Sequence, residues 1–288
     1  MDKVTVGADP EFFVVHTTEE KGEHHFSIEG LIGGTKESPL PIPGLSTGCM
    51  GQEDNVMAEF NVPPSSRYDH FGVYCTNTRT QLLQLIRNNA HDQNIQISTE
   101  CEVLYPYEYL QTPQSRMFGC SPDQNAYKGG TVFPAISPED LTEDDGQWRF
   151  AGGHIHIGYE SKVPHFVAAM FADVYLGIPC AGVDWQDKRR QYYGQPGRYR
   201  AKPYGIEYRT LSNFWIHSQS HTHRLGRNAL VLGDWLQYTD PAIIQEKFQS
   251  IPWMDVIRVI QNNNRKIAND LYSYIVEDLE MPSGGMLP

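Results

Sequence analysis

Four short segments of the chain repeat one pattern, in which polar side chains two positions apart alternate with apolar ones. The polar pairs are Asp9 with Glu11, Glu59 with Asn61, His154 with His156, and Glu207 with Arg209. The apolar neighbours are Ala8, Phe12, Ala58, Phe60, Ile155, Ile157, Ile206 and Tyr208. Because residues i and i+2 of a strand point to the same side, each segment is predicted to be a strand with one polar and one buried face. If these strands are neighbours, their polar faces merge into one patch of carboxylates, imidazoles and a guanidinium.

The remaining periodicity predicts a single α+β domain over residues 1–280, with helices packed on one face of a sheet and a short tail at 281–288. Strands are predicted at about 4–14, 55–62, 102–110, 147–159 and 205–214. Helices are predicted at about 66–89, 165–176, 220–236, 242–248 and 253–278, the first of them capped by Ser65 or Ser66. The Gly- and Pro-rich stretch 22–51 predicts loops and short hairpins, and 118–138 predicts turns that end in an acidic loop at 139–145.

Composition excludes several classes of protein. The 288 residues are 40% hydrophobic and 20% charged, which is typical of globular rather than disordered or fibrous chains. The net charge of −12 argues against sequence-independent binding to a nucleic-acid backbone. Five dispersed cysteines without a CxxC predict neither a disulfide framework nor a zinc ribbon. No apolar run is long enough to span a membrane, and the first residues have a strand pattern rather than that of a signal peptide. We therefore expect a cytoplasmic protein without membrane contact.

The carboxylates of the four segments predict a metal site. Asp9 and Glu11 alone are typical of a solvated strand face, and Glu207 with Arg209 alone is typical of a local salt bridge. Two histidines flanked by glycines at 152–158 are costlier to bury without partners. Crowded carboxylates require cations, and oxygen ligands with an imidazole suit Mg²⁺ or Mn²⁺ better than zinc.

A basic segment leads directly into the last of these strands. Six of the 23 Lys and Arg residues lie within fifteen positions, interleaved with tyrosines: Lys188, Arg189, Arg190, Arg198, Arg200 and Lys202. Such a segment is consistent with a solvated loop that balances the acidic stretch 139–145, or with a bound polyphosphate beside the metal site. The chain has no GxxxxGK[ST] and no GxGxxG motif, which excludes P-loop and Rossmann nucleotide binding.

Taken in order, the motifs resemble a known family. The segments GADPEF, GLIGGTKESP, EDNVMAEFNVPP, FGCSPDQNAY, AGGHIHIG and KPYGIEYRTLSNFW, between residue 4 and about residue 215, are similar to those of the phage-encoded carboxylate-amine ligases (COOH-NH2 ligase, type 2). That group is related to glutamine synthetase and glutamate-cysteine ligase. The resemblance implies the glutamine synthetase-like catalytic fold, a curved antiparallel sheet that holds ATP and two or three Mg²⁺ or Mn²⁺ ions. It also implies a phage source and hence the host cytoplasm.

The resemblance also implies roles for individual residues. Metal would be bound by Asp9, Glu11, Glu59, His154 and Glu207, and ATP phosphates by His156, Arg198, Arg200, Lys202 and Arg209. The implied reaction has two steps: a small-molecule carboxylate attacks the γ-phosphate of ATP, and an amine then attacks the acyl phosphate. Asp54 or Glu53 would deprotonate the amine. The loop 30–51 would exclude water, with Lys36 available to an anionic substrate.

Other functions are consistent with the same residues. A guanidino-kinase-like phosphoryl transferase on the same fold would release a phosphorylated product rather than free phosphate. A metal-dependent hydrolase would need no ATP, and a phage structural protein with an idle site would have no turnover. The sequence does not identify the two substrates, and it is compatible with a homo-oligomer as well as with a monomer.

Overall fold

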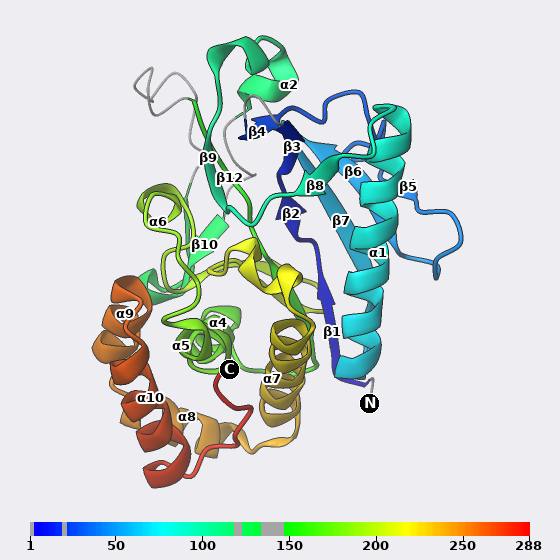
Figure 1. Cartoon of the computed structure of the whole chain (residues 1–288). Coiled ribbons are helices and arrows are strands. Elements are labelled where there is room, and N and C mark those ends of the chain that lie inside the picture. The colour runs from blue at the N-terminus through cyan, green and yellow to red at the C-terminus, as the bar shows by residue number, and fades with distance from the viewer. Residues whose placement is uncertain (1–2, 19–21, 118–122, 134–146) are drawn as a thin grey trace.

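A ten-stranded antiparallel sheet organises the computed structural model, which describes residues 3–18, 22–117, 123–133 and 147–288 (Figure 1). From edge to edge the strands are β11 (Thr131–Phe133), β10 (Asp123–Asn125), β14 (Arg198–Lys202), β15 (Gly205–Tyr208), β13 (Ile155–Gly158), β1 (Thr5–Ala8), β7 (Met57–Ser65), β6 (Met50–Asp54) and β5 (Leu40–Pro41), and β2 (Glu11–Phe12) also pairs with β7. A two-stranded sheet joins β9 (Glu102–Leu104) to β12 (Trp148–Phe150). A third sheet places β3 (Val14–Thr18) between β4 (Gly22–Phe26) and β8 (Ile95–Ile97).

The helices follow the predicted order. They are α1 (Tyr68–Asn89), α2 (Pro113–Arg116), α4 (His165–Ala172), α5 (Ile178–Cys180), α6 (Arg189–Tyr192), α7 (Gln219–Tyr238), α8 (Pro241–Ser250), α9 (Trp253–Asn262) and α10 (Arg265–Ser273). Two π-helical segments, η4 (Asp173–Gly177) and η6 (Tyr274–Asp278), continue α4 and α10, and single 3-10 turns lie at η1 (Tyr107–Tyr109), η2 (Ala126–Lys128) and η5 (Asn213–His217). Among the described residues no helix is both long and apolar enough to cross a bilayer.

The apolar face of the large sheet packs against α1, α4 and α7. Figure 1 shows α1 beside β7 and β1, and α7 to α10 gathered in the lower half of the molecule. The strands contribute fully buried side chains to this core, among them Val6, Phe60, Ile155, Ile157 and Ile206. Each such side chain stabilises the fold by about 1.5–3 kcal/mol relative to an exposed position. Because strand side chains alternate, the polar residues between them face the opposite side.

The four polar segments are neighbours, as predicted. His156 lies opposite Gly7 of β1 and Glu207 of β15 in the ladders, and Glu11 lies opposite Glu59. The alternation of apolar and polar positions was therefore sufficient to identify one continuous polar sheet face. The mixed α+β class and the antiparallel sheet agree with the prediction.

Several predicted boundaries are wrong. The first predicted strand is three strands, and Pro10, which cannot donate a ladder hydrogen bond, lies in the break between β1 and β2. The predicted strand 147–159 is two strands in different sheets, separated at Gly153, where a Cβ would collide with the carbonyl oxygen of Ser212. The predicted strand 102–110 continues as a 3-10 turn after Leu104.

Two helix boundaries also differ. Arg67 rather than Ser65 or Ser66 occupies the N-cap position of α1 and makes no side-chain capping bond, while the Ser65 hydroxyl bonds to the backbone of Arg67. The predicted last helix is interrupted at Asn263, whose left-handed conformation (φ 49°) ends α9. The acidic loop 139–145 and much of the turn-rich stretch 118–138 lie outside the described residues.

Candidate active site

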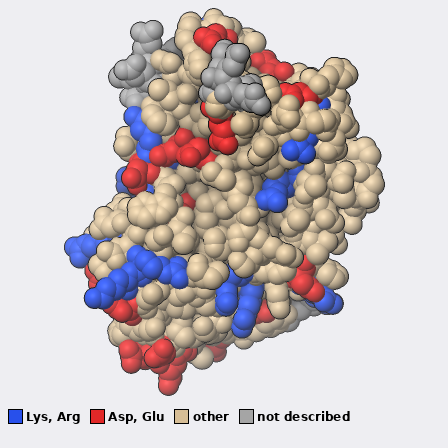
Figure 2. Space-filling model, in the orientation of Figure 1, with Lys and Arg blue, Asp and Glu red and all other residues tan. Residues whose placement is uncertain are grey.

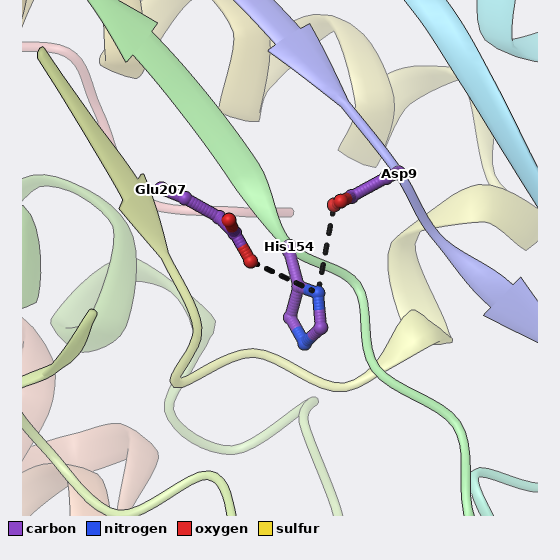
Figure 3. Close-up of side chains that lie close together, drawn as sticks. All are labelled: Asp9, His154 and Glu207. Carbon is purple, nitrogen blue, oxygen red and sulfur yellow. Dashed lines mark ion pairs between the residues drawn. The ribbon is translucent and has the colours of Figure 1, made fainter. Parts of the chain in front are cut away.

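A carboxylate–imidazole group lies where β1, β13 and β15 meet. In this Asp9 group, defined as Asp9, His154 and Glu207, the Nδ1 atom of His154 is 3.5 Å from Asp9 Oδ1 and 3.7 Å from Glu207 Oε1 (Figure 3). The three residues come from three neighbouring strand ends, so that sheet pairing alone brings them together. Gly152 leaves room for the imidazole, because a Cβ there would collide with the ring of His154.

Cationic side chains surround Glu207, whose side chain is completely buried. Lys202 Nζ lies 2.8 Å and Arg200 NH1 3.3 Å from Glu207 Oε2, and Arg209 NH1 donates to Glu207 Oε1. Arg200 faces Glu207 directly because the two are ladder partners between β14 and β15. Burial and the charge of Asp9 oppose ionisation of Glu207, but the charges of Arg209, His154 and Arg200 lower its pKa to about 2.

His156 lies between Asp9 and Tyr204. Its Nε2 atom is 3.0 Å from Asp9 Oδ1, its Nδ1 atom is 2.5 Å from the Tyr204 hydroxyl, and the two rings stack. Burial alone would raise the pKa of Asp9, but the two histidines hold it well below the ordinary value. Burial opposes protonation of His156, yet the charge of Asp9 raises its pKa. Burial and the charge of Arg209 lower the pKa of His154 to about 4, so that this imidazole is neutral at pH 7, as a metal ligand must be.

A second cluster, the Glu11 group, consists of Glu11, Asp54 and Glu59. Glu11 Oε2 accepts the Gly152 N–H at 2.6 Å, while Glu59 Oε2 is buried without a hydrogen bond among the described residues. Burial and the charge of Asp54 raise the pKa of Glu11 to about 8, and burial together with the charges of Asp9, Asp54 and Glu11 raises the pKa of Glu59 well above its ordinary value. The three carboxylates are thus crowded together, which raises the cost of ionising Glu11 and Glu59.

Both groups are suited to a divalent cation. Each offers three ligand atoms that lie within 4.8 Å of one another. Carboxylate oxygens with one neutral imidazole in the Asp9 group, and carboxylates alone in the Glu11 group, are donor sets that Mg²⁺ and Mn²⁺ accept. A bound cation would contact the buried Glu59 Oε2 and offset the repulsion among the three carboxylates. Asp9 and Glu11, which the sequence placed on one strand face, thus belong to two different groups.

The sequence left Asp54 and Glu53 as alternatives for the base, and the structure shows that their surroundings differ. Asp54 and Glu53 are successive residues of β6, so their side chains point to opposite sides. Asp54 joins the Glu11 group and lines the adjoining pocket. Glu53 instead accepts hydrogen bonds from the backbone N–H groups of Ile32 and Gly33 at 2.9 and 2.8 Å. Asp54 is therefore the one placed to face a substrate.

The pocket beside the Glu11 group contains residues that the sequence did not indicate. It is open to solvent, and among its walls are Asp54, Asp123, Trp148, Arg149, Arg189 and Arg209. Both Arg149 and Arg189 are 2% exposed. Burial lowers the pKa of Arg149 to about 10. No spacing signal marks Asp123 or Arg149, since Arg149 has no charged partner two positions away in the predicted strand 147–159, and Arg189 appeared only within the basic segment.

Not all of the predicted phosphate ligands lie together. Arg200, Lys202, Arg209 and His156 surround the Asp9 group, whereas Arg198 donates to Asp123 Oδ1 at 2.6 Å and to Gln195 Oε1 at 2.7 Å. Asp123 also lies 3.7 Å from Arg209 Nε, so that two side chains, Asp123 and Arg209, separate Arg198 from Glu207. On the face shown in Figure 2, the described Lys and Arg side chains form separate groups among acidic ones rather than a continuous basic surface.

Comparison with known proteins agrees with the motif resemblance. No curated protein matches the chain. Residues 147–273 match the family described as phage phiEco32-like COOH.NH2 ligase-type 2. The matched stretch contains the site residues His154, His156, Arg198, Arg200, Lys202, Glu207 and Arg209. The match confirms the resemblance read from the sequence motifs: residues 147–273 of this chain are similar to the phage phiEco32-like COOH.NH2 ligase-type 2 family.

Proposed function

We propose that this protein is an ATP-dependent carboxylate–amine ligase, which forms an amide or peptide bond through an acyl phosphate on a glutamine synthetase-like sheet. One observation carries the proposal: two clusters suited to divalent cations lie side by side on the polar sheet face, and in one of them three cationic side chains contact the same buried carboxylate, Glu207. Because of this asymmetry, we assign the cluster with the cationic side chains to the phosphates of ATP, as the phosphate end of the site. The other cluster is assigned to the substrate carboxylate, as the carboxylate end. The proposal also fits the family to which residues 147–273 are similar.

The Asp9 group is the proposed phosphate end. Three cationic side chains contact Glu207, namely those of Arg200, Lys202 and Arg209. Some of their N–H groups would donate hydrogen bonds to the phosphates of ATP. His156, held between Asp9 and Tyr204, lies next to them. Mg²⁺ or Mn²⁺, two or three ions in all, would neutralise charge on the phosphoryl oxygens when bound. We place Asp9, His154 and Glu207 as ligands there.

The Glu11 group and its pocket are the proposed carboxylate end. Glu11 and Glu59 would hold a cation beside the substrate carboxylate, and Arg189 is an anion-binding side chain in the pocket wall. Arg209 lines the same pocket and also bonds to Glu207, so that it can stabilise charge on the phosphoryl group in transfer. Asp54, at the pocket wall, is the proposed base that removes a proton from the attacking amine.

Calorimetric titration of ATP with Mn²⁺ tests the phosphate end. We expect binding to the wild type, and loss of at least tenfold in affinity in Glu207→Ala and Arg209→Ala. Glu246→Ala, which changes a carboxylate on α8 whose side chain is 70% exposed, is the matched control and should bind as the wild type does. Absence of binding to well-folded wild-type protein would contradict the proposal and favour a metal-dependent hydrolase or an idle site.

Product analysis then tests the reaction. Pools of carboxylates and amines are added with ATP, and ADP, free phosphate and phosphorylated products are measured. A ligase releases ADP and phosphate in equal amounts, and only when both substrates are present. A phosphorylated amine without free phosphate would instead identify a guanidino-kinase-like phosphoryl transferase. We propose the bacterial host cytoplasm as the place of action, since the family is described as phage-encoded.

A further inference from the structure

Glu53 is the anchor of a glycine-rich loop. Its Oε1 atom accepts the N–H groups of Ile32 and Gly33 at 2.9 and 2.8 Å, and its Oε2 atom accepts the Gly30 N–H and Gln114 Nε2, each at 3.1 Å. Hydrogen bonds to a charged acceptor are stronger than neutral ones. Burial opposes ionisation, but these donors lower the pKa of Glu53 below its ordinary value. One carboxylate thus fixes three backbone N–H groups between residues 30 and 33.

Hydrogen bonds also fix the backbone that follows this anchor. The Glu53 N–H donates to the Gly34 carbonyl at 2.9 Å, so that the loop is tied to β6 by backbone as well as by side chain. Gly34 permits this approach, since a Cβ there would lie 2.6 Å from the Gly51 carbonyl oxygen. Thr35 and Ser38 then exchange backbone hydrogen bonds at 3.2 and 3.1 Å. Lys36 therefore lies in a tight turn whose base is fixed at the end of β6.

The turn adjoins the Glu11 group. Asp54 of that group follows Glu53 directly in β6, and Gln52 before it pairs with Glu59 in β7. The loop and the Glu11 group therefore lie at the same end of β6, although the side chains of Glu53 and Asp54 leave the strand on opposite sides. The charge of Lys36 opposes the raised pKa values of both Glu11 and Glu59, which is consistent with an ammonium close to these two carboxylates.

We propose that Glu53 is a positioning residue, whose carboxylate holds the loop 30–38 so that Lys36 binds the anionic group of the carboxylate substrate at the Glu11 group. The role of Lys36 rests on the proposed ligase function, whereas the role of Glu53 in holding the loop does not. Glu53 itself has its oxygens occupied by the loop and by Gln114, and it is not the base.

Limited trypsin digestion tests the loop without any assumption about activity. Cleavage after Lys36, followed by mass spectrometry, reports how often the turn opens. We expect Glu53→Gln to accelerate this cleavage roughly tenfold, because an amide replaces a carboxylate that serves four donors. Cleavage after Lys162, in a distant exposed segment, is the internal reference for the activity of the protease.

Glu29→Gln is the matched control. Glu29 is a second carboxylate beside the same loop, but its Oε2 atom accepts from the Thr112 hydroxyl at 2.8 Å and not from residues 30–33. The Glu29→Gln variant should be cleaved after Lys36 at the wild-type rate. Equal rates for Glu53→Gln and the wild type would overturn the role of Glu53, and equal acceleration in Glu29→Gln would reduce the effect to any loss of charge near the loop.

Oxalate binding to the Mn²⁺-loaded protein tests the substrate role of Lys36. Oxalate serves as a carboxylate probe that requires neither ATP nor an amine. Lys36→Ala and Glu53→Gln should each weaken oxalate binding about fivefold to tenfold, the double variant should be no weaker than Lys36→Ala, and Lys36→Arg should retain most of the affinity. If Glu53 had a merely structural role, the losses of oxalate affinity in Glu53→Gln and Lys36→Ala would add in the double variant.

The two assays distinguish the possible failures. Faster cleavage with unchanged oxalate affinity would overturn the substrate role of Lys36 while the loop anchor stands. Absence of Mn²⁺ binding in the wild type would overturn the proposed function together with the role of Lys36, and the digestion would still decide the role of Glu53.

Discussion

Glu207 is the residue on which most of the site's charge balance depends. Its buried carboxylate contacts Lys202, Arg200 and Arg209. Loss of one partner from a buried ionic network is destabilising, because the remaining charges stay buried and uncompensated. Each of these cations would lose a charged partner if Glu207 were neutral.

We therefore predict that Glu207→Gln lowers the free energy of unfolding of the metal-free protein by about 3 kcal/mol. Urea denaturation at pH 7 and low ionic strength measures the change. Glu246→Gln on α8 should change it by less than about 0.5 kcal/mol, as exposed substitutions usually do. A Glu207→Gln variant as stable as the wild type would show that the three cations are adequately solvated without the carboxylate.

The sequence predicted single residues well wherever strand parity determined their direction. Asp9, Glu59, His154 and Glu207 all face the site because alternate residues of a strand share a side. Parity did not distinguish Asp54 from Glu53, since the strand that carries them was not recognised. It also gave no signal for Asp123 and Arg189, whose positions depend on pairings and packing between distant segments.

At the scale of elements, Asp173 joins three parts of the fold. It lies at the start of η4 and accepts hydrogen bonds from the hydroxyls of Tyr208 in β15, at 2.6 Å, and Tyr127 in η2, at 2.8 Å. Burial raises the pKa of Asp173 to about 6, although these hydrogen bonds oppose the shift. The folded protein thus binds this proton more tightly than the unfolded chain does.

The sign of the pH dependence follows from that difference. Between about pH 4 and pH 6 the folded state holds more protons at this site, so its contribution to the free energy of unfolding falls as pH rises, by up to about 3 kcal/mol. Asp173→Asn removes the titration but keeps one acceptor oxygen. We predict that wild-type stability minus Asp173→Asn stability, from urea denaturation at pH 4, 5, 6 and 7, declines through this window. A constant difference would contradict the prediction.

Element boundaries were less predictable than element existence. The helices 66–89 and 165–176 agree closely with α1 and with α4 through η4, because their apolar residues recur at helical spacing over several turns. The strand breaks at Pro10 and Gly153 were missed, because an alternating pattern continues through a position where the chain changes partners. The partner of each segment is a tertiary property that local spacing does not contain.

For the whole molecule, the last residues are part of the packed structure rather than a free tail. Met281 and Leu287 are buried, the Tyr272 hydroxyl accepts the Gly284 N–H at 3.1 Å, and Asn228 donates to the Gly285 carbonyl at 2.9 Å. These contacts join the segment 281–288 to α7 and α10. The segment therefore contributes to the same core as the helices that precede it.

We predict that deletion of residues 281–288 lowers the free energy of unfolding by about 4 kcal/mol, since two apolar side chains lose their burial and several donors lose their acceptors. Leu287→Ala should account for roughly 2–3 kcal/mol of this loss. Met254→Ala, at a side chain that is 61% exposed, is the control and should have little effect. A deletion variant as stable as the wild type would show that the packing of this segment contributes little to the free energy of unfolding.

The site is built from segments that are far apart in the chain. Asp9 and Glu59 come from the first quarter of the chain, and His154 and Glu207 come from its second half. A ligand that contacts all of them must stabilise the fold as a whole. At a free concentration one hundred times its dissociation constant, such a ligand adds about 2.7 kcal/mol to the free energy of unfolding. We predict that Mn²⁺ with a non-hydrolysable ATP analogue raises the melting temperature of the wild type by at least about 4 °C. The rise should be abolished by EDTA and largely lost in Asp9→Asn, because that variant gives up the carboxylate that links the phosphate end to both histidines. An equal rise in Asp9→Asn would place the nucleotide away from the sheet face on which both clusters lie.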